Sequence, residues 1–269
     1  MLNLNYINAE NKNEALELLQ KERGNACLVA GATNVLPYIV TKALSNRVLI
    51  NIKNIKELYG IQETKNKIII GALTTMEEIE KSEAIKNNAL ALYQAAADFA
   101  DPITRNNATI AGNIADASPA SDSSPALLAM NAVVVAESAE KGKREIPITE
   151  FFKGVRKTAL AEDELITAIE IPKNIANQTS QFIKVGLRKA MAISVVTMAV
   201  SAEIKNKNFE NLSIAIGSCA PTPVRATHFE KSLIGKTANE KTIDAFVAEI
   251  GKDIKPIDDI RATAAYRKE

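Results

Sequence analysis

A short apolar run that starts at Cys27 passes into small residues in the segment Leu28-Val29-Ala30-Gly31-Ala32-Thr33-Asn34-Val35. Such a run is typical of a buried strand, and the small residues after it indicate a tight turn into a helix. Small residues let a backbone approach a ligand closely, and consecutive N–H groups form a concave anion site. The segment fits a phosphate-binding turn, although, taken alone, it fits an ordinary strand-to-helix turn better.

A second segment of the same kind is Thr109-Ile110-Ala111-Gly112-Asn113-Ile114, followed by Ser118-Pro119-Ala120-Ser121-Asp122. The whole stretch Thr109–Ser124 lacks an apolar period, so we expect a long loop, and long loops between well-formed elements are usually functional. Two such loops could hold a diphosphate from two sides, and Asp122 is suited to accept hydrogen bonds from ribose hydroxyls. Neither segment matches the Gly-x-Gly-x-x-Gly or Gly-Lys-Ser/Thr patterns, which excludes the Rossmann and nucleotide-hydrolase classes.

Outward from these segments, the pattern alternates short strands and helices up to residue 172. We expect strands at 27–30, 48–52, 68–72, 132–136 and 165–171, and helices at 14–21, 76–80, 84–100 and 126–130, the last starting from Ser124-Pro125. The polar stretch Lys173–Thr179 is the expected domain boundary. Beyond it, 193–204 and 212–217 predict antiparallel strands, and helices are expected at 226–233, 240–250 and 257–268.

The composition is that of an ordinary soluble globular protein. The length of 269 residues corresponds to about two domains, and a hydrophobic share of 46% excludes a disordered chain. A formal net charge of +1 gives no bulk attraction for nucleic acid or anionic lipid. No apolar run approaches the roughly 18 residues of a membrane span, and the first residues lack the features of a signal peptide. We therefore expect a cytoplasmic protein without a membrane span.

Cysteine and histidine are too few for several kinds of site. Cys27 and Cys219 cannot build a disulfide framework or a four-cysteine metal site, and His228 is the single histidine. We expect no metal and no iron–sulfur cluster in this chain. Cys27 is expected to be a small buried hydrophobe.

Both glycine-containing segments resemble the FAD-binding (medium) subunit of molybdenum hydroxylases, of the xanthine, carbon monoxide and nicotinate dehydrogenase types. The likeness continues in Asp163–Ile166, Phe182–Arg188, Ala220–Ala226 and Asp258–Arg267, in that order. It covers essentially the whole chain, and the joint pattern is specific.

The resemblance implies cofactor-binding residues and no catalytic side chain. The backbone of the first loop would hold the FAD diphosphate with the Thr33 hydroxyl nearby, and the second loop would close over it. Asp122 would take the nucleotide end, Ile166 and Lys184 would lie beside the cofactor, and Phe99 falls where relatives carry an aromatic residue near the flavin. Lys184 would lie close to the isoalloxazine, where a cation raises the flavin potential. The full implied set is Leu28, Val29, Ala30, Gly31, Ala32, Thr33, Asn34, Val35, Phe99, Thr109, Ile110, Ala111, Gly112, Asn113, Asp122, Ile166 and Lys184.

The implied fold is α+β. Residues 1–175 would form an FAD-binding domain of the PCMH/VAO-like type, with two α/β subdomains at about 1–55 and 56–175. Residues 176–269 would form a smaller domain of the carbon monoxide dehydrogenase flavoprotein type, with a three-stranded antiparallel sheet and helices. The isoalloxazine would lie near their junction.

The implied function is electron transfer within an oxidoreductase of several subunits. Electrons from [2Fe–2S] clusters on a small partner subunit would pass through non-covalent FAD to NAD or another acceptor. Substrate hydroxylation would take place at molybdopterin on a large partner subunit. The sequence determines neither the hydroxylated substrate nor the physiological acceptor.

Two alternatives remain open at this point. One is a stand-alone FAD-dependent reductase of the related cell-wall UDP-sugar reductase type, which would need an acid and a substrate pocket in the C-terminal domain. The other is a scaffold that has lost its flavin, because relatives commonly carry Gly-Gly where this chain has Gly31-Ala32 and Ala111-Gly112. Alanine suits these positions only if the φ angle is negative there.

Overall fold

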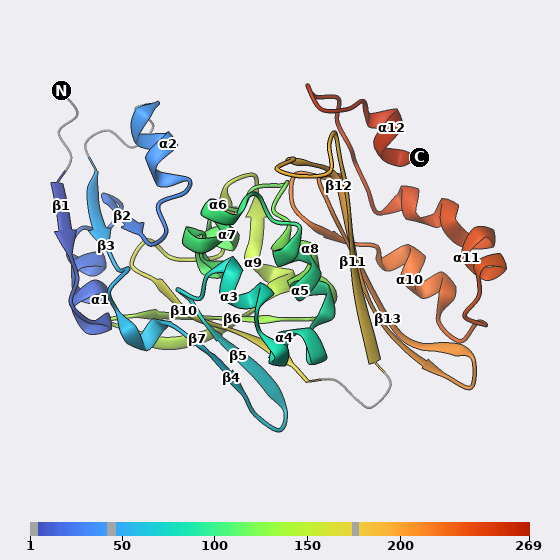
Figure 1. Cartoon of the computed structure of the whole chain (residues 1–269), viewed down its shortest axis with the longest axis horizontal. Coiled ribbons are helices and arrows are strands. Elements are labelled where there is room, and N and C mark those ends of the chain that lie inside the picture. The colour runs from blue at the N-terminus through green and yellow to red at the C-terminus, as the bar shows by residue number, and fades with distance from the viewer. Residues whose placement is uncertain (1–4, 42–46, 174–177) are drawn as a thin grey trace.

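The computed structural model describes residues 5–41, 47–173 and 178–269. Three parts follow one another along the long axis: an N-terminal sheet, a central sheet covered by helices, and a C-terminal sheet (Figure 1). The protein is α+β, as predicted.

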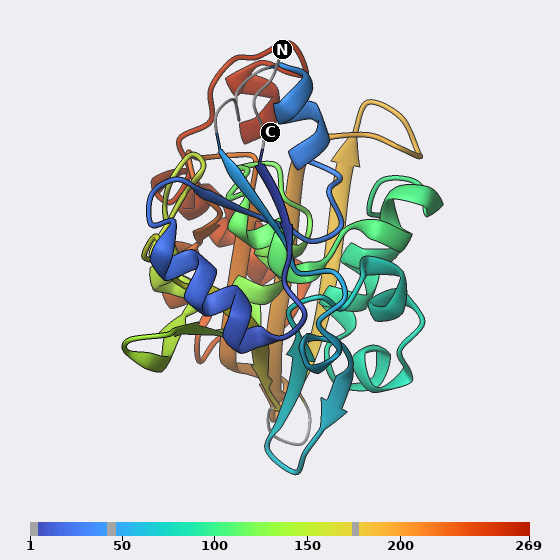
Figure 2. The ribbon, with the colours of Figure 1, turned by 90° about the vertical axis from the view of Figure 1, so that its left-hand side faces the viewer.

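The N-terminal part is a parallel sheet of β1 (Asn5–Asn8), β3 (Val48–Asn51) and β2 (Ala26–Val29), in that spatial order. Helix α1 (Lys12–Lys21) buries Leu16 and Leu19, and Asn11 caps its N-terminus. Helix α2 (Val35–Val40) follows the first loop and buries none of its residues. Figure 2 views the molecule from this end. Because the strands are parallel, their carboxyl ends open on one edge, where the first loop begins.

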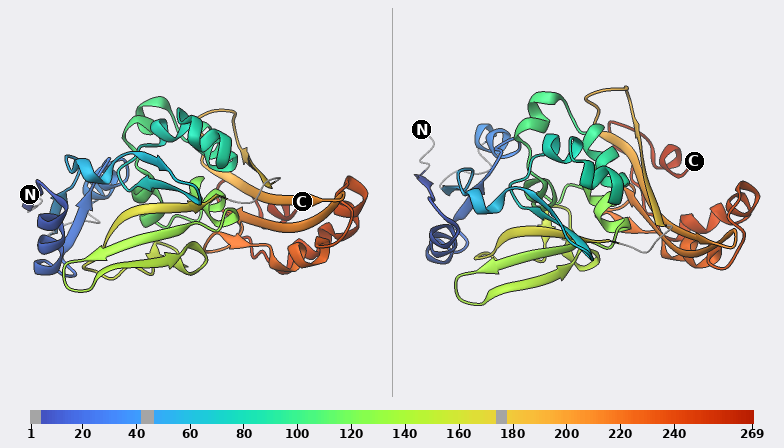
Figure 3. Two further views of the ribbon diagram at one scale, coloured as in Figure 1. Left: turned by 90° about the horizontal axis from the view of Figure 1, so that it is seen from below. Right: turned by 60° about the horizontal axis from the view of Figure 1, so that its bottom comes forward.

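The central part is an antiparallel sheet in the order β4 (Ile61–Glu63), β5 (Lys67–Gly71), β10 (Leu165–Pro172), β6 (Val133–Ser138) and β7 (Gly142–Pro147). Its helices are α3 (Met76–Glu80), α4 (Glu83–Asn88), α5 (Leu90–Ala97), α6 (Pro102–Asn107), α7 (Ile110–Ala115), α8 (Ser123–Ala129) and α9 (Ile148–Phe151). Helices α3 to α8 lie on one side of the sheet (Figure 3). Together they enclose a large apolar core that includes Ile70, Leu92, Ile110 and Phe151. A 3-10 helix (Lys56–Leu58) and a small hairpin of β8 (Phe152–Gly154) and β9 (Lys157–Thr158) complete this part.

Two sequence predictions in the central part were wrong. The single helix expected at 84–100 is broken at Ala89, whose φ and ψ of −144° and 52° leave the helical region. Ala89 is fully buried, so packing of α4 and α5 overrides the high helix propensity of this alanine-rich stretch.

The loop expected at 109–124 contains helix α7 and the start of α8. The Thr109 side chain caps α7 by accepting a hydrogen bond from the Gly112 N–H, and Ile110 and Ile114 bury one face. Six residues are too few to show an apolar period, which is why the pattern was missed. Helix α8 starts at Ser123 and not at the expected Ser124-Pro125.

The C-terminal part has three long antiparallel strands, β11 (Gln178–Gly186), β12 (Ser194–Lys205) and β13 (Asn208–Gly217), as predicted, and a two-residue edge strand, β14 (Val224–Arg225). Helices α5 and α8 of the central part pack on this sheet. Helix α10 (Thr227–Leu233) also packs on β13, and α11 (Glu240–Phe246) and a 3-10 helix (Val247–Lys252) pack on α10. The C-terminal sheet therefore packs both on the central helices α5 and α8 and on the C-terminal helix α10.

The helix predicted at 257–268 is limited to α12 (Ala264–Lys268). The carboxylates of Asp258 and Asp259 accept hydrogen bonds from the N–H groups of Ala264 and Arg261. Such side-chain-to-backbone bonds compete with helix formation, so the segment before Ala264 is irregular. None of the helices in the described ranges is long and apolar enough to cross a membrane.

Candidate cofactor site

The first loop, Ala30–Asn34, presents unpaired backbone donors at the carboxyl edge of the N-terminal sheet. Within the described residues, no hydrogen bond is made by the N–H groups of Gly31, Ala32, Thr33 and Asn34. Ala32 has a φ of 58°, so the condition of a negative φ is not met there and this alanine adopts a left-handed conformation. A left-handed residue in this turn arranges neighbouring N–H groups as an anion-binding concavity.

Gly31 brings the first loop into direct contact with the segment before α7. A Cβ atom on Gly31 would lie 1.7 Å from the carbonyl oxygen of Asn107, so only glycine allows this approach. The two segments predicted to face each other are therefore adjacent, although the contact is made by Asn107 and not by the expected Thr109–Asn113.

In the second segment, the backbone donors are already used within the protein. The N–H groups of Ile110 and Ala111 donate to the carbonyls of Thr74 and Ala72, and both residues are buried. The Gly112 N–H donates to the Thr109 hydroxyl. Because Ala111 is helical, its φ is negative, and the condition for alanine is met there. Backbone amides 110–112 are thus not available to a diphosphate in this conformation.

What the second segment offers instead is the side chain of Asn113. Its carbonyl oxygen accepts hydrogen bonds from the Ser121 and Ser123 hydroxyls at 2.7 and 2.6 Å. These bonds fix which end of the amide is the donor. The Asn113 side-chain nitrogen has no partner among the described residues and can donate to an anion.

Asp116, at the end of α7, ties the second segment to helix α2. It accepts a hydrogen bond from the Tyr38 hydroxyl at 2.8 Å and forms an ion pair with Arg156, which also lies over the Tyr38 ring. Burial raises the pKa of Asp116, and a hydrogen bond from Asn34 opposes the shift. Because α2 buries no residue of its own, this contact holds it beside the first loop. Sequence reasoning missed Tyr38 and Asp116, which carry no motif.

Asp122 and Lys184 form a buried ion pair that joins the central and C-terminal parts. Lys184 Nζ lies 2.6 Å from Asp122 Oδ2, and both side chains are 8% exposed. The same nitrogen donates to the Asp98 carbonyl at 3.0 Å. Burial raises the pKa of Asp122 to about 6 even though Lys184 favours the carboxylate. Asp122 Oδ1 is buried without a hydrogen-bond partner, which leaves it available to a ligand.

Phe99 packs against the central apolar core, and Ile166 is part of that core. Phe99 is partly buried and directly follows Asp98, whose carbonyl accepts the Lys184 bond. Ile166 is 4% exposed on β10. Beside Lys184, the turn between β11 and β12 borders a hollow of about 490 Å³, lined by Asp98, Lys184, Val185, Gly186, Arg188, Lys189, Met191 and Ala192.

The remaining candidates lie outside this arrangement. His228 is exposed at the start of α10, with Nδ1 2.7 Å from Asp253. Cys27 is half-buried rather than fully buried, and burial raises the pKa of its thiol. Over the described ranges, no three His, Cys, Asp or Glu side chains lie close enough to hold a metal ion.

Comparison with known proteins agrees with this architecture. Residues 2–174 match the family model described as the FAD-binding domain in molybdopterin dehydrogenase, and residues 181–269 match that of the CO dehydrogenase flavoprotein C-terminal domain. The glyceraldehyde dehydrogenase medium chain of Sulfolobus acidocaldarius is 30% identical over 98% of this chain and 92% of its own. The nicotinate dehydrogenase FAD-subunit of Eubacterium barkeri is 32% identical over 90% of this chain and 83% of its own. The structure of carbon monoxide dehydrogenase from Hydrogenophaga pseudoflava superimposes with a TM-score of 0.94 at 29% identity, covering 98% of this chain and 92% of that one.

The fold and the two family matches define a flavoprotein of the molybdopterin dehydrogenase class. The chain belongs to the FAD-binding subunits of the molybdenum hydroxylase family and is an oxidoreductase subunit. FAD is the cofactor of the family. The unpaired amides of the first loop and the unpartnered Asp122 Oδ1 are features that FAD would satisfy.

Proposed function

We propose that this chain carries FAD between an electron-donating small subunit with [2Fe–2S] clusters and NAD or another acceptor. Substrate hydroxylation would take place at molybdopterin on a large subunit. Support comes from relatives whose names describe them as medium chains or FAD subunits of dehydrogenases. Bound FAD would accept and release electrons. This chain would supply the FAD-binding site. We place the protein in the cytoplasm and the boundary between its two domains near residue 175.

The proposal rests on the first loop, whose N–H groups are unpaired and whose Gly31 lies close to the carbonyl of Asn107. We assign these groups, the Thr33 hydroxyl and the Asn113 side-chain nitrogen to the FAD diphosphate. Together they form a neutral donor set that suits phosphate oxygens.

We assign the isoalloxazine to the side of the C-terminal sheet, next to Phe99 and the Asp122–Lys184 pair. Sequence reasoning placed Asp122 at the nucleotide end and Lys184 at the flavin. Because their side chains are 2.6 Å apart, the two residues serve the same portion of the cofactor. Lys184 lies in the sheet next to the hollow at the β11–β12 turn, through which an acceptor could approach, so we place that portion at the flavin.

The stand-alone reductase is the less favoured reading. Its relatives would be single-chain enzymes, whereas the relatives named above are medium chains or FAD subunits of dehydrogenases. The hollow of about 490 Å³ at the β11–β12 turn is lined by no Asp or Glu of the described C-terminal part, 178–269.

Purification of the tagged chain from its native host tests the proposal. We expect FAD, iron and molybdenum to elute together with one larger and one smaller polypeptide. Purification of a yellow single chain that turns over an organic substrate without molybdenum would contradict it.

A further inference from the structure

We propose that Lys53 is a further cofactor-binding residue, whose ammonium group neutralises a phosphate of FAD at the first loop. The proposal rests on the proposed function, because it requires FAD at this loop. Neither the sequence motifs nor the family likeness pointed to Lys53.

The FAD diphosphate carries two negative charges, but segments 28–35 and 109–122 contain no lysine or arginine, and the second adds Asp116 and Asp122. Backbone and amide donors would orient the phosphates without neutralising them. Phosphate sites in proteins commonly add a lysine as a point charge.

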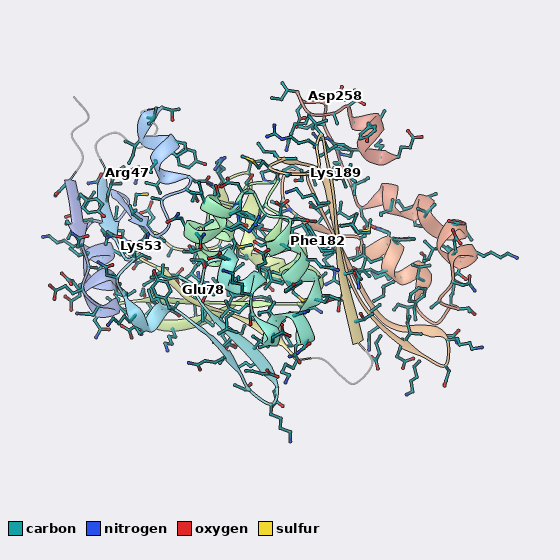
Figure 4. All side chains as sticks on the ribbon, viewed as in Figure 1. Arg47, Lys53, Glu78, Phe182, Lys189 and Asp258 are labelled. Atoms are coloured by element: carbon teal, nitrogen blue, oxygen red, sulfur yellow. The ribbon has the colours of Figure 1, made fainter. Side chains whose placement is uncertain are left out.

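Lys53 follows the carboxyl end of β3, the central strand of the parallel sheet, whose neighbour β2 leads into the first loop. Its N–H donates to the Asn51 side chain at 3.1 Å, and the Tyr59 hydroxyl donates to its carbonyl at 2.7 Å. Its backbone is thus held on the edge from which the loop departs. Figure 4 labels Lys53 between the N-terminal sheet and the central helices.

Lys53 also contacts the loop pair itself. Lys53 Nζ lies 3.4 Å from Asn107 Oδ1, and the carbonyl oxygen of the same asparagine meets Gly31. One residue therefore separates the ammonium group from the point where the two segments touch.

Three other cations of the site are each paired with a carboxylate. Arg105 is paired with Glu80 at 2.8 Å, Arg156 with Asp116, and Lys184 with Asp122. Lys53 contacts no carboxylate within the described ranges, and its partner Asn107 is neutral. Its charge is therefore uncompensated and available to an anion.

Titration of the FAD-free chain with FAD tests the proposal, using Lys53→Met and Lys53→Arg. The matched control is Lys56→Met, which removes an exposed lysine three residues further on. At low ionic strength we expect Lys53→Met to weaken FAD binding by about five- to twenty-fold, with Lys53→Arg close to wild type and Lys56→Met unchanged. The salt dependence of the wild-type dissociation constant should become shallower in Lys53→Met, because one ion pair is lost.

Three outcomes would overturn the assignment: equal affinity of Lys53→Met and Lys56→Met, an unchanged salt dependence, or a matching loss of thermal stability in FAD-free Lys53→Met that arginine does not restore. A wild-type chain that binds no FAD would instead overturn the proposed function. The two failures are therefore distinguishable.

Discussion

At the scale of single residues, the net charge of the Asp122–Lys184 pair depends on the protonation state of Asp122. The cation predicted to stabilise reduced flavin is paired with a carboxylate, so its field is partly cancelled. Burial raises the pKa of that carboxylate to about 6. Removing the lysine and removing the carboxylate should therefore shift the midpoint potential of the flavin in opposite directions.

The first prediction concerns the flavin potential at pH 7.5. Lys184→Met removes a positive charge and should lower the two-electron midpoint potential by roughly 20–45 mV, and Asp122→Asn should raise it by a similar amount. Spectroelectrochemical titration of the FAD-loaded variants measures both shifts. Shifts of the same sign, or a large loss of FAD affinity in Lys184→Met, would show that the lysine holds the cofactor rather than tuning it.

The second prediction concerns stability against pH. The pKa of Asp122 is raised in the folded state to about 6, from 3.8, so the folded chain binds more protons than the unfolded chain between these values. The contribution of Asp122 to stability is therefore greatest below about pH 4 and is lost as the pH rises through 6. Asparagine does not titrate. The unfolding free energy of FAD-free Asp122→Asn, relative to wild type, should rise by about 1–3 kcal/mol between pH 4 and pH 7. Urea titrations across this range measure the difference; a constant difference would contradict it.

At the scale of elements, the close approach of the first loop to Asn107 decides the geometry of the site. A loop and a helix end that touch through backbone atoms leave no space for a side chain. The alanines beside Gly31 and Gly112 lie in different environments: Ala32 is in a left-handed turn and Ala111 is in helix α7.

The third prediction is that Gly31→Ala separates the two segments. Its Cβ atom would meet the Asn107 carbonyl, which is backbone and cannot rotate away. We expect a loss of about 1–3 kcal/mol in stability and roughly ten-fold or more in FAD affinity. Gly251→Ala is the control, because a Cβ atom there meets nothing within 4 Å. Denaturation and FAD titration of both variants provide the comparison, and equal behaviour would refute the close contact.

The fourth prediction is that replacing alanine by glycine lowers stability at position 111 but not at position 32. Ala32→Gly relieves a left-handed conformation and should leave stability unchanged or raise it by up to about 1 kcal/mol. Ala111→Gly places glycine inside a helix and should lower stability by about 0.5–1 kcal/mol. Thermal melts of both variants under one condition decide the signs, and a stabilised Ala111→Gly would be inconsistent with helix α7.

At the scale of the whole molecule, the proposed site draws on all three parts of the chain. The first loop comes from the N-terminal sheet, Asn113 and Asp122 from the central part, and Lys184 from β11 of the C-terminal sheet. FAD bound across these parts should stabilise them together, since a ligand that binds only the folded state adds to its stability.

The fifth prediction is that FAD binds without a covalent bond. The single histidine, His228, is paired with Asp253 on α10, and Cys27 lies in β2 ahead of the loop with its side chain contacting the Leu28 carbonyl. Acid precipitation should release all of the yellow colour to the supernatant. Flavin retained in the washed pellet would contradict this expectation.

Several features of this protein could be read from local sequence alone. The first loop was predicted from its small residues after an apolar strand, and the long C-terminal strands from their continuous apolar runs. The family likeness followed from ordered motifs over the whole chain and was confirmed by matches to residues 2–174 and 181–269. These patterns depend on residues close together in the sequence, so they can be recognised without knowledge of the tertiary packing.

Other features were decided only by tertiary structure. The break at Ala89, the helical state of 110–115 and the φ of Ala32 depend on which neighbours surround these residues. The ion pair of Asp122 with Lys184 joins positions 62 residues apart, and the contact of Gly31 with Asn107 joins two backbones. Lys53 appears in the sequence as one surface lysine among many. Only the parallel pairing of β3 with β2 brings it to the edge where the first loop begins, because strand order is set by burial and not by local propensity.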